Sequence, residues 1–136
     1  QYDIMLLKLG RPVETITPVS LNFNATVPRD DTSVTAVGLG IRQIMTAPIV
    51  LNEVRLNAIG YEDCTGQNDY FWSQSLIVDN RMQCAGRFAG AICSGDSGGP
   101  LIVKGRKADE DVQVGIASFT SQVCGDRRFP SVFIKT

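Results

Sequence analysis

Hydrophobic and polar residues alternate along several short stretches of the chain, as they do in strands that bury one face. In residues 112–118, Val112, Val114 and Ile116 share one face, while Gln113 lies on the other. Similar β-rich runs are found at residues 33–40, 51–59, 100–104 and 131–135. Turn-forming clusters such as VPRDDTS and KGRKADED separate the runs. Short strands divided by frequent turns predict an all-β sandwich or barrel.

Two stretches depart from this pattern. Residues 60–72, with the sequence GYEDCTGQNDYFW, predict irregular or briefly helical structure. Residues 11–31 contain Pro12, Pro18 and Pro28 and predict an extended connection. Internal repeats and low-complexity segments are absent from the sequence, so its 136 residues predict one domain.

Charge and hydropathy exclude several classes of partner. The chain has 13 basic and 14 acidic residues, for a net charge of −1, and so lacks a basic field for nucleic acid or an anionic membrane. No apolar run is long enough to span a bilayer. The first residues, QYDIMLLKL, lack the features of a signal peptide and begin directly in strand-like sequence. We therefore expect the chain to begin inside a larger unit.

The cysteines and one asparagine indicate an oxidising, secretory compartment. Four cysteines allow three pairings, and none of the gaps between them is a CxxC. Because the chain has no histidine, zinc would need all four cysteines at unsuitable spacing. We expect two disulfides in an oxidising compartment, and neither a metal nor another cofactor. The triplet NAT makes Asn24 a candidate for N-glycosylation, although so short a motif also arises by chance and supports secretion only weakly.

The sequence AICSGDSGGP has the properties of a loop that presents a nucleophile, Ser97. Gly95, Gly98 and Gly99 allow unusual backbone angles and close approach of a substrate backbone. The N–H groups of Gly95 and Ser97 are candidates for an oxyanion hole. Asp96 would need a cationic partner if it is buried. A polar turn explains a bare SGG, but GDSGGP is too specific for that explanation. A serine nucleophile usually needs a histidine base, which this sequence lacks.

These residues resemble the trypsin/chymotrypsin family of serine endopeptidases, in which GDSGGP carries the nucleophile. The resemblance implies that Ser97 is the nucleophile and that the N–H groups of Gly95 and Ser97 hold the oxyanion. It implies that Asp96 pairs with the new N-terminal amine after zymogen cleavage. YDIMLLKL at residues 2–9 is similar to the family's DIALLKL, so Asp3 corresponds to the triad aspartate. The family order is His, Asp, Ser, which places the expected histidine upstream of residue 1.

The resemblance also implies an architecture. The chain is expected to form an antiparallel β-barrel of the trypsin-like double-barrel fold, with the first barrel largely missing. Residues 1–10 would be a strand left from the first barrel, residues 11–31 the connection, and residues 32–136 most of the second barrel. The missing barrel would be the main packing partner, and the protein would be secreted, with its signal peptide outside this chain. The disulfides that the resemblance implies are Cys64–Cys84 and Cys93–Cys124.

The implied substrate pocket lacks the carboxylate of trypsin-type members. Ala91 lies six residues before the nucleophile, where those members carry aspartate. Thr120 and Ser131 replace usual glycines, so two added β-carbons should narrow the pocket. Ser118 corresponds to the residue that supports the triad aspartate and binds substrate backbone. We expect cleavage after small or medium apolar residues, and the alternative is a degraded pocket without specificity. The expected lining is Ala91, Ile92, Ser94, Ser118, Phe119, Thr120 and Ser131.

The sequence leaves two main functions open. The first is a serine endopeptidase that acts on proteins or peptides; the isolated 136 residues, which lack a histidine, are expected to be inactive. The second is a protease homologue that has lost catalysis and works as a binding or inhibitory protein. The absent histidine and the unusual Ala91, Phe119 and Thr120 favour this alternative. A histidine in an AAHC-like context upstream of residue 1 would favour the enzyme. An inert fragment is the third possibility.

Overall fold

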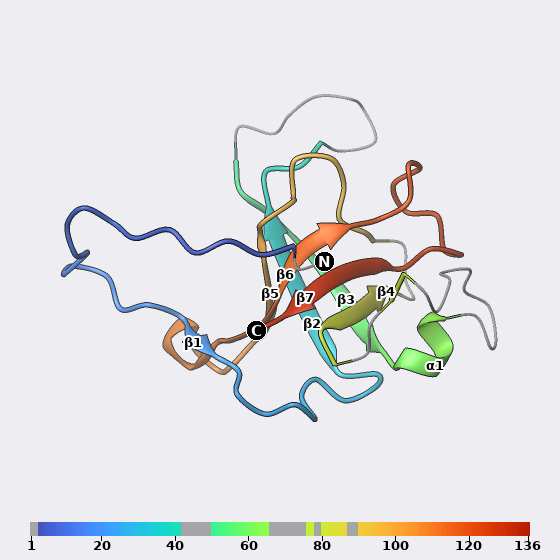
Figure 1. The fold of residues 1–136 in the computed structure, drawn as a ribbon, viewed down its shortest axis with the longest axis horizontal. Coiled ribbons are helices and arrows are strands. Elements are labelled where there is room, and N and C mark those ends of the chain that lie inside the picture. Colours follow the sequence, from blue (N-terminus) through green and yellow to red (C-terminus); the bar gives the residue numbers. More distant parts are fainter. Residues whose placement is uncertain (1–2, 42–49, 66–75, 78–79, 87–89) are drawn as a thin grey trace.

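A computed structural model describes residues 3–41, 50–65, 76–77, 80–86 and 90–136. Its main strands are β2 (Ser33–Gly38), β3 (Asn52–Ile59), β4 (Met82–Gly86), β5 (Pro100–Val103), β6 (Val112–Phe119) and β7 (Ser131–Lys135). The order β6-β5-β2-β3-β4-β7 returns to β6 through a β6–β7 pairing, which closes a six-stranded antiparallel barrel (Figure 1). The all-β barrel expected from the sequence is therefore confirmed.

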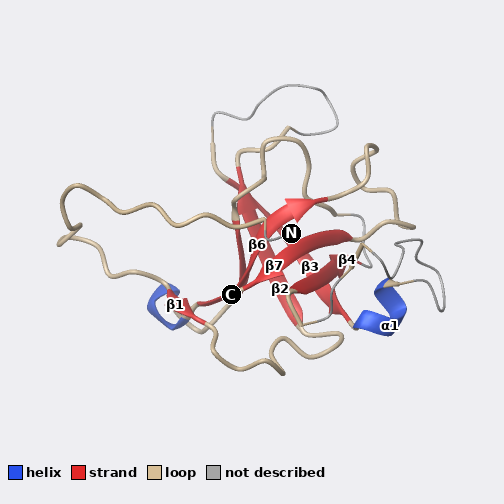
Figure 2. Ribbon diagram, in the orientation of Figure 1, coloured by secondary structure: helices blue, strands red, loops and turns tan. Residues whose placement is uncertain are grey.

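Three short elements lie outside this barrel (Figure 2). The two-residue strand β1 (Ser20–Leu21) adds to the start of β6 in parallel orientation. A one-turn helix, α1 (Tyr61–Cys64), begins the segment predicted to be irregular or briefly helical. A 3-10 turn, η1 (Ala108–Glu110), precedes β6. Residues 66–72 of the predicted irregular segment lie outside the described residues.

Alternation accounts for the strands that the sequence predicted. In β3, Leu56 and Ala58 are buried, whereas Glu53 and Arg55 are exposed. The strand β4 was not predicted, because four of its five residues are buried and its sequence, MQCAG, does not alternate. Its conformation follows from antiparallel pairing with β3 on one side and β7 on the other.

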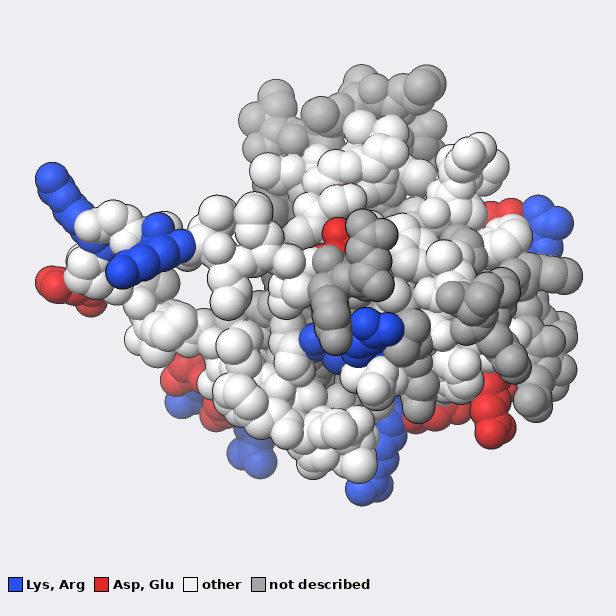
Figure 3. Space-filling model, viewed as in Figure 1, with Lys and Arg blue, Asp and Glu red and all other residues white. Residues whose placement is uncertain are grey.

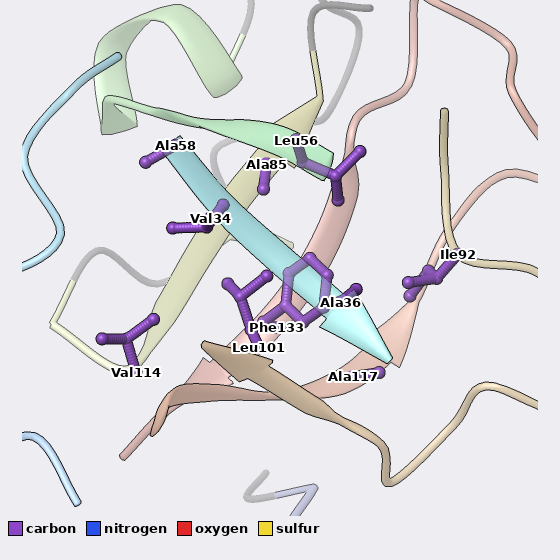
Figure 4. Close-up of a cluster of buried hydrophobic side chains, with 10 residues drawn as sticks. All are labelled: Val34, Ala36, Leu56, Ala58, Ala85, Ile92, Leu101, Val114, Ala117 and Phe133. Atoms are coloured by element: carbon purple, nitrogen blue, oxygen red, sulfur yellow. The ribbon is translucent and has the colours of Figure 1, made fainter. Parts of the chain in front are cut away.

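Side chains from all six barrel strands fill the interior (Figure 4). Phe133 of β7 is fully buried and is the largest of the fully buried side chains. Burying a side chain of this size contributes about 1.5–3 kcal/mol relative to leaving it exposed. The main cluster consists of Val34, Ala36, Leu56, Ala58, Ala85, Ile92, Leu101, Val114, Ala117 and Phe133.

Two disulfides tie loops to this barrel. Cys64 of α1 joins Cys84 of β4, with their Cα atoms 6.2 Å apart, inside a second buried cluster. Cys93 joins Cys124, with a Cα–Cα distance of 5.4 Å. This is the pairing that the resemblance implies. Each links residues 20 or 31 positions apart, and in the loop-entropy account a disulfide of this span contributes about 3–4 kcal/mol.

The N-terminal segment runs outside the barrel (Figure 1). Residues 3–19 contain no strand, and their apolar side chains are exposed, with Leu6 at 93% and Leu7 at 76%. The strand expected within residues 1–10 is thus not found in the described residues 3–10. A strand is held by hydrogen bonds to a neighbour, and the described residues place none beside it. The division of the chain into a first-barrel remnant, a connection and a second barrel stays a prediction.

Charges of both signs lie around the edge of the face shown in Figure 3, and a small group of each sign lies nearer its centre, so the described residues form no broad patch of one sign there. In the described part of the chain, no helix has the length and apolar character needed to cross a membrane. The same residues contain no group of three or more His, Cys, Asp or Glu side chains placed to hold a metal ion.

Candidate active site

The loop around Ser97 is held from inside by the carboxylate of Asp96. Asp96 Oδ1 accepts a hydrogen bond from the Gly40 N–H at 2.7 Å, and Asp96 Oδ2 accepts one from the Cys93 N–H at 2.9 Å. The loop also carries a turn in which the Gly99 N–H donates to Asp96 O at 2.9 Å. Hydrogen bonds to a charged acceptor are stronger than neutral ones. The half-buried carboxylate therefore fixes the loop through two backbone donors, one 56 residues away and the other three residues away.

Glycines give this loop its shape. Gly95 and Gly98 have φ values of +96° and +81°, which residues with a Cβ rarely adopt. A Cβ on Gly40 would collide with the Asp96 carboxylate, and a Cβ on Gly38 would do the same. Sequence reasoning missed Gly38 and Gly40 as parts of this site. The signal was the sequence VGLG, which ends the run predicted at residues 33–40.

Ser97 is exposed at the outer side of the loop. In the described structure, the N–H groups of Gly95 and Ser97 have no protein acceptor, whereas the N–H groups of Asp96, Gly98 and Gly99 are all bonded. Two exposed N–H groups that flank a fixed carboxylate are free to donate to a bound oxyanion. The loop thus offers a hydroxyl and two unused donors to the solvent.

Two backbone hydrogen bonds tie the loop to β6. The Gly98 N–H donates to Ala117 O, and the Ala117 N–H donates to Gly99 O, both at 2.8 Å. The register between β6 and β7 shifts between Ala117 and Phe119, so Ser118 is the extra residue of a bulge. Bulges next to functional sites redirect a side chain.

Ser118 connects this bulge to the N-terminal segment. Its Oγ donates to Asp3 Oδ2 at 2.5 Å, although the two residues are 115 positions apart. A path of contacts therefore runs from Asp3 through Ser118 and Ala117 to Gly98, which follows Ser97. The structure brings the two predicted catalytic residues of this chain to the same end of β6.

The residues expected to line the substrate pocket do not share one environment in the structure. Ala91 and Ser131 line a cavity of about 10 Å³ together with Gly90, Gly125 and Pro130. Ser131 is 1% exposed, and its Oγ accepts the Ile92 N–H at 3.1 Å. That these two residues line the substrate pocket stays a prediction.

The other expected lining residues lie nearby. The Ile92 side chain belongs to the buried core, while Phe119 packs against the second buried cluster. Ser94 is exposed. Thr120 Oγ1 is buried without a hydrogen-bond partner among the described residues. A buried hydroxyl without a partner is costly, and the lining of the substrate pocket by Thr120 stays a prediction.

A larger cavity, of about 410 Å³, lies on the inner side of the loop. Asp96 lines it together with Gly38, Gly40, Ala91 and Cys93. Sequence reasoning expected a buried carboxylate here to need a cation. The structure supplies two backbone N–H groups, and the cavity leaves room for a further donor beside them, so pairing with a cation stays a prediction.

The loop after Cys124 borders both cavities. Arg128 forms a two-point contact with Asp126, from Nε to Oδ1 at 3.1 Å and from Nη2 to Oδ2 at 2.8 Å. Hydrogen bonds from the Arg128 side chain, and then from its backbone N–H, hold the pKa of Asp126 below its usual value. The same carboxylate raises the pKa of Arg128. Asp126, which lines the small cavity, is therefore paired with a cation from its own loop.

A closed antiparallel barrel with a GDSGGP loop is typical of trypsin-like serine proteases. The sequence model of the family described as Trypsin matches residues 1–136. The chain belongs to the trypsin family.

Curated relatives agree with this assignment. The snake venom serine protease KN5 of Trimeresurus stejnegeri is 37% identical over 138 residues, which cover 98% of this chain and 49% of the relative. Factor V activator of Macrovipera lebetinus is 35% identical, with the same coverage. Ovochymase of Halocynthia roretzi is 32% identical over 139 residues, which cover 98% of this chain and 8% of the relative. The chain spans about half the length of the venom proteases that it matches.

Proposed function

We propose that the protein is a secreted serine endopeptidase in which Ser97 is the nucleophile and Asp3 the triad aspartate. One observation carries the proposal: the hydrogen-bonded path that joins Asp3 to the Ser97 loop through Ser118. Family membership, and relatives that are named proteases, support the endopeptidase class. Two disulfides and venom relatives support an extracellular site of action on protein or peptide substrates.

In this proposal the general base is a histidine outside the 136 residues, which contain none. The histidine takes the proton of Ser97 Oγ as the oxygen attacks the substrate carbonyl, and Asp3 orients the imidazole. The N–H groups of Gly95 and Ser97 hold the oxyanion, and losing one such donor typically costs about 3 kcal/mol. Ser118 keeps Asp3 in position through the hydrogen bond at 2.5 Å.

Asp96 has a regulatory role in the same proposal. The new N-terminal amine that zymogen cleavage creates would enter the 410 Å³ cavity and pair with the carboxylate. Since the carboxylate already accepts the Gly40 and Cys93 N–H groups, the amine would complete the set of donors that fixes the oxyanion loop.

The proposed specificity is for small or medium apolar residues before the cleaved bond. A substrate cation that faced Ala91 would be buried without a partner, which is costly. Buried Ser131, bonded to the Ile92 backbone, fills space at the base of the small cavity. The support is therefore both electrostatic and steric.

The alternative function is a non-catalytic homologue that binds or inhibits another protein. Its support is compositional: the described chain supplies no base, and Ala91, Phe119 and Thr120 depart from the usual family residues. The upstream sequence separates the two functions, because a homologue would lack the histidine there.

A peptide-library cleavage profile of the full-length, activated protein tests the proposal. We expect cleavage after Ala, Val or Leu, and a loss of about a million-fold in kcat for Ser97→Ala. The control is Ser20→Ala on exposed β1, which should cleave at the wild-type rate. A strong preference for Arg would contradict the pocket assignment. A folded protein with no cleavage by either variant or wild type would favour the homologue.

A further inference from the structure

The proposed catalysis leaves one motif of the sequence unused, the triplet Asn24-Ala25-Thr26. It is the one N-x-[ST] triplet in the 136 residues, because Asn22, Asn52, Asn57, Asn68 and Asn80 are not followed by Ser or Thr at the second position. Such a triplet occurs by chance, so its surroundings must decide whether it is used.

The structure makes Asn24 accessible. Asn24, Ala25 and Thr26 are all exposed and lie in a turn closed by the Val27 N–H, which donates to Asn24 O at 3.0 Å. The neighbouring side chain of Phe23 is 94% exposed, so no core packing covers this turn in the described structure. Surface turns of this kind are where glycan acceptors occur in secreted proteins.

Hydrogen bonds also orient the Asn24 amide. Its Oδ1 accepts the Thr26 hydroxyl at 2.8 Å and the Thr26 N–H at 3.0 Å. The described residues offer no acceptor to Asn24 Nδ2, which is the atom that a glycan would join. Asn22 provides a contrast two positions earlier, because its Nδ2 donates to Asn24 O and to Val27 O, each at 3.0 Å. The asparagine with the free nitrogen is the one in the triplet.

The turn is also far from the candidate active site. The Asn22 N–H donates to Gln113 O near the start of β6, while the Ser97 loop is bonded to Ala117 near its end. Four residues of a strand span about 13 Å. A bulky group on Asn24 would therefore lie near the start of β6, whereas the Ser97 loop lies near its end.

We propose that Asn24 is an N-glycosylation site of this protein. Asn24 Nδ2 bonds to the anomeric carbon of an oligosaccharide, whose bond to a lipid diphosphate carrier breaks while the amide nitrogen loses a proton. The carrier leaves as the free lipid diphosphate, and no oxidant or reductant takes part. One consequence is structural: whatever covers the exposed apolar residues of the N-terminal segment leaves Asn24 open to solvent.

Glycopeptide mapping of the full-length protein secreted from animal cells tests this inference. Peptide N-glycosidase digestion in ¹⁸O-water should convert Asn24 to labelled Asp, which mass spectrometry of the peptide that contains residue 24 detects. Ser97→Ala should carry the same glycan, so the result does not depend on proteolytic activity. Secreted protein with unmodified Asn24, or protein that never enters the secretory pathway, would overturn the proposal.

Matched variants sharpen the test. Thr26→Val removes the hydroxyl and keeps the shape of the side chain, so it should abolish the ¹⁸O label on Asn24. Thr26→Ser keeps a hydroxyl and should retain modified protein. Asn22→Gln, which changes the neighbouring asparagine outside the triplet, should leave the glycan in place. An ¹⁸O label on Asn24 that survives Thr26→Val, or one that disappears in Asn22→Gln while that protein is secreted, would contradict the assignment.

Discussion

The strand β6 and the N-terminal segment are similarly apolar in sequence, yet only β6 is buried. Val114 in β6 is fully buried between β5 and β7, whereas Leu6 in the N-terminal segment is 93% exposed. β6 pairs with neighbours on both sides, while residues 3–19 have no strand partner among the described residues. The comparison shows that an apolar run forms a buried strand here when a neighbouring strand supplies its hydrogen bonds. Even so, the exposed segment provides Asp3 to the candidate site through one side-chain contact.

The largest effect on stability should come from Phe133→Ala, set against Phe23→Ala. Phe133 is fully buried and Phe23 is 94% exposed. We expect Phe133→Ala to lower the free energy of unfolding by about 3–5 kcal/mol. Phe23→Ala should change it by about 0.5 kcal/mol or less. Urea unfolding of the full-length protein measures both, and equal losses would show that the chain around Phe23 is packed as firmly as the barrel.

A smaller effect should follow from adding one methyl group to a glycine. A Cβ at Gly40 would collide with the Asp96 carboxylate, whereas a Cβ at Gly10 would meet nothing within 4 Å. Gly40→Ala should cost about 1–3 kcal/mol of unfolding free energy through overpacking. Gly10→Ala should leave stability unchanged or raise it slightly, because it restricts the unfolded chain. If Gly40→Ala proved neutral, the Asp96 carboxylate would not be fixed as described.

Ser118→Ala should loosen the N-terminal segment with little effect on the barrel. The variant removes the hydrogen bond to Asp3, and a bond between exposed groups contributes about 1 kcal/mol or less to stability. Limited proteolysis at Lys8 and Arg11 should become several-fold faster. Ser121→Ala is the matched control, because its hydroxyl bonds locally to Val123 O. Equal proteolysis of the two variants would show that Ser118 does not hold the segment.

The smallest effect concerns the charge pair beside the pocket. The side-chain hydrogen bonds from Arg128 lower the pKa of Asp126, so Arg128→Gln should raise that pKa toward its usual value of 3.8. Because the folded-state pKa is depressed, the pair stabilises the protein above the unfolded pKa. That contribution disappears as the pH falls through the folded-state pKa. If an NMR titration gave Asp126 the same pKa in the wild type and in Arg128→Gln, Arg128 would not be the cause of the lowered pKa.

Strands with alternation could be predicted from the sequence, and those defined by their neighbours could not. The run at residues 131–135 coincides with β7, whereas β4 has no alternation and depends on pairing with β3 and β7. The run at residues 33–40 was too long by two residues, because the Gly40 N–H bonds to Asp96 instead of extending the strand. The described residues 3–10 contain no strand and the described structure places no hydrogen-bonding strand beside them, so the first-barrel strand expected there stays a prediction.

The sequence revealed the residues of the candidate site that are contiguous in the chain. Ser97 and its glycines are contiguous, so GDSGGP was sufficient to find them. The donors of Asp96 were not found, because Gly40 is 56 residues away and contributes only its backbone. The bulge that directs Ser118 toward Asp3 arises from a register shift between β6 and β7, which the sequence does not reveal.

The most direct test of the central claim is labelling of the activated full-length protein with a fluorophosphonate, followed by peptide mass spectrometry. The reagent forms a covalent bond only with an activated serine. We predict one adduct, on Ser97, which is lost when the protein is unfolded before labelling and is absent from Ser97→Ala. A folded protein that has the upstream histidine but gains no adduct on Ser97, or gains one on another serine, would contradict the account.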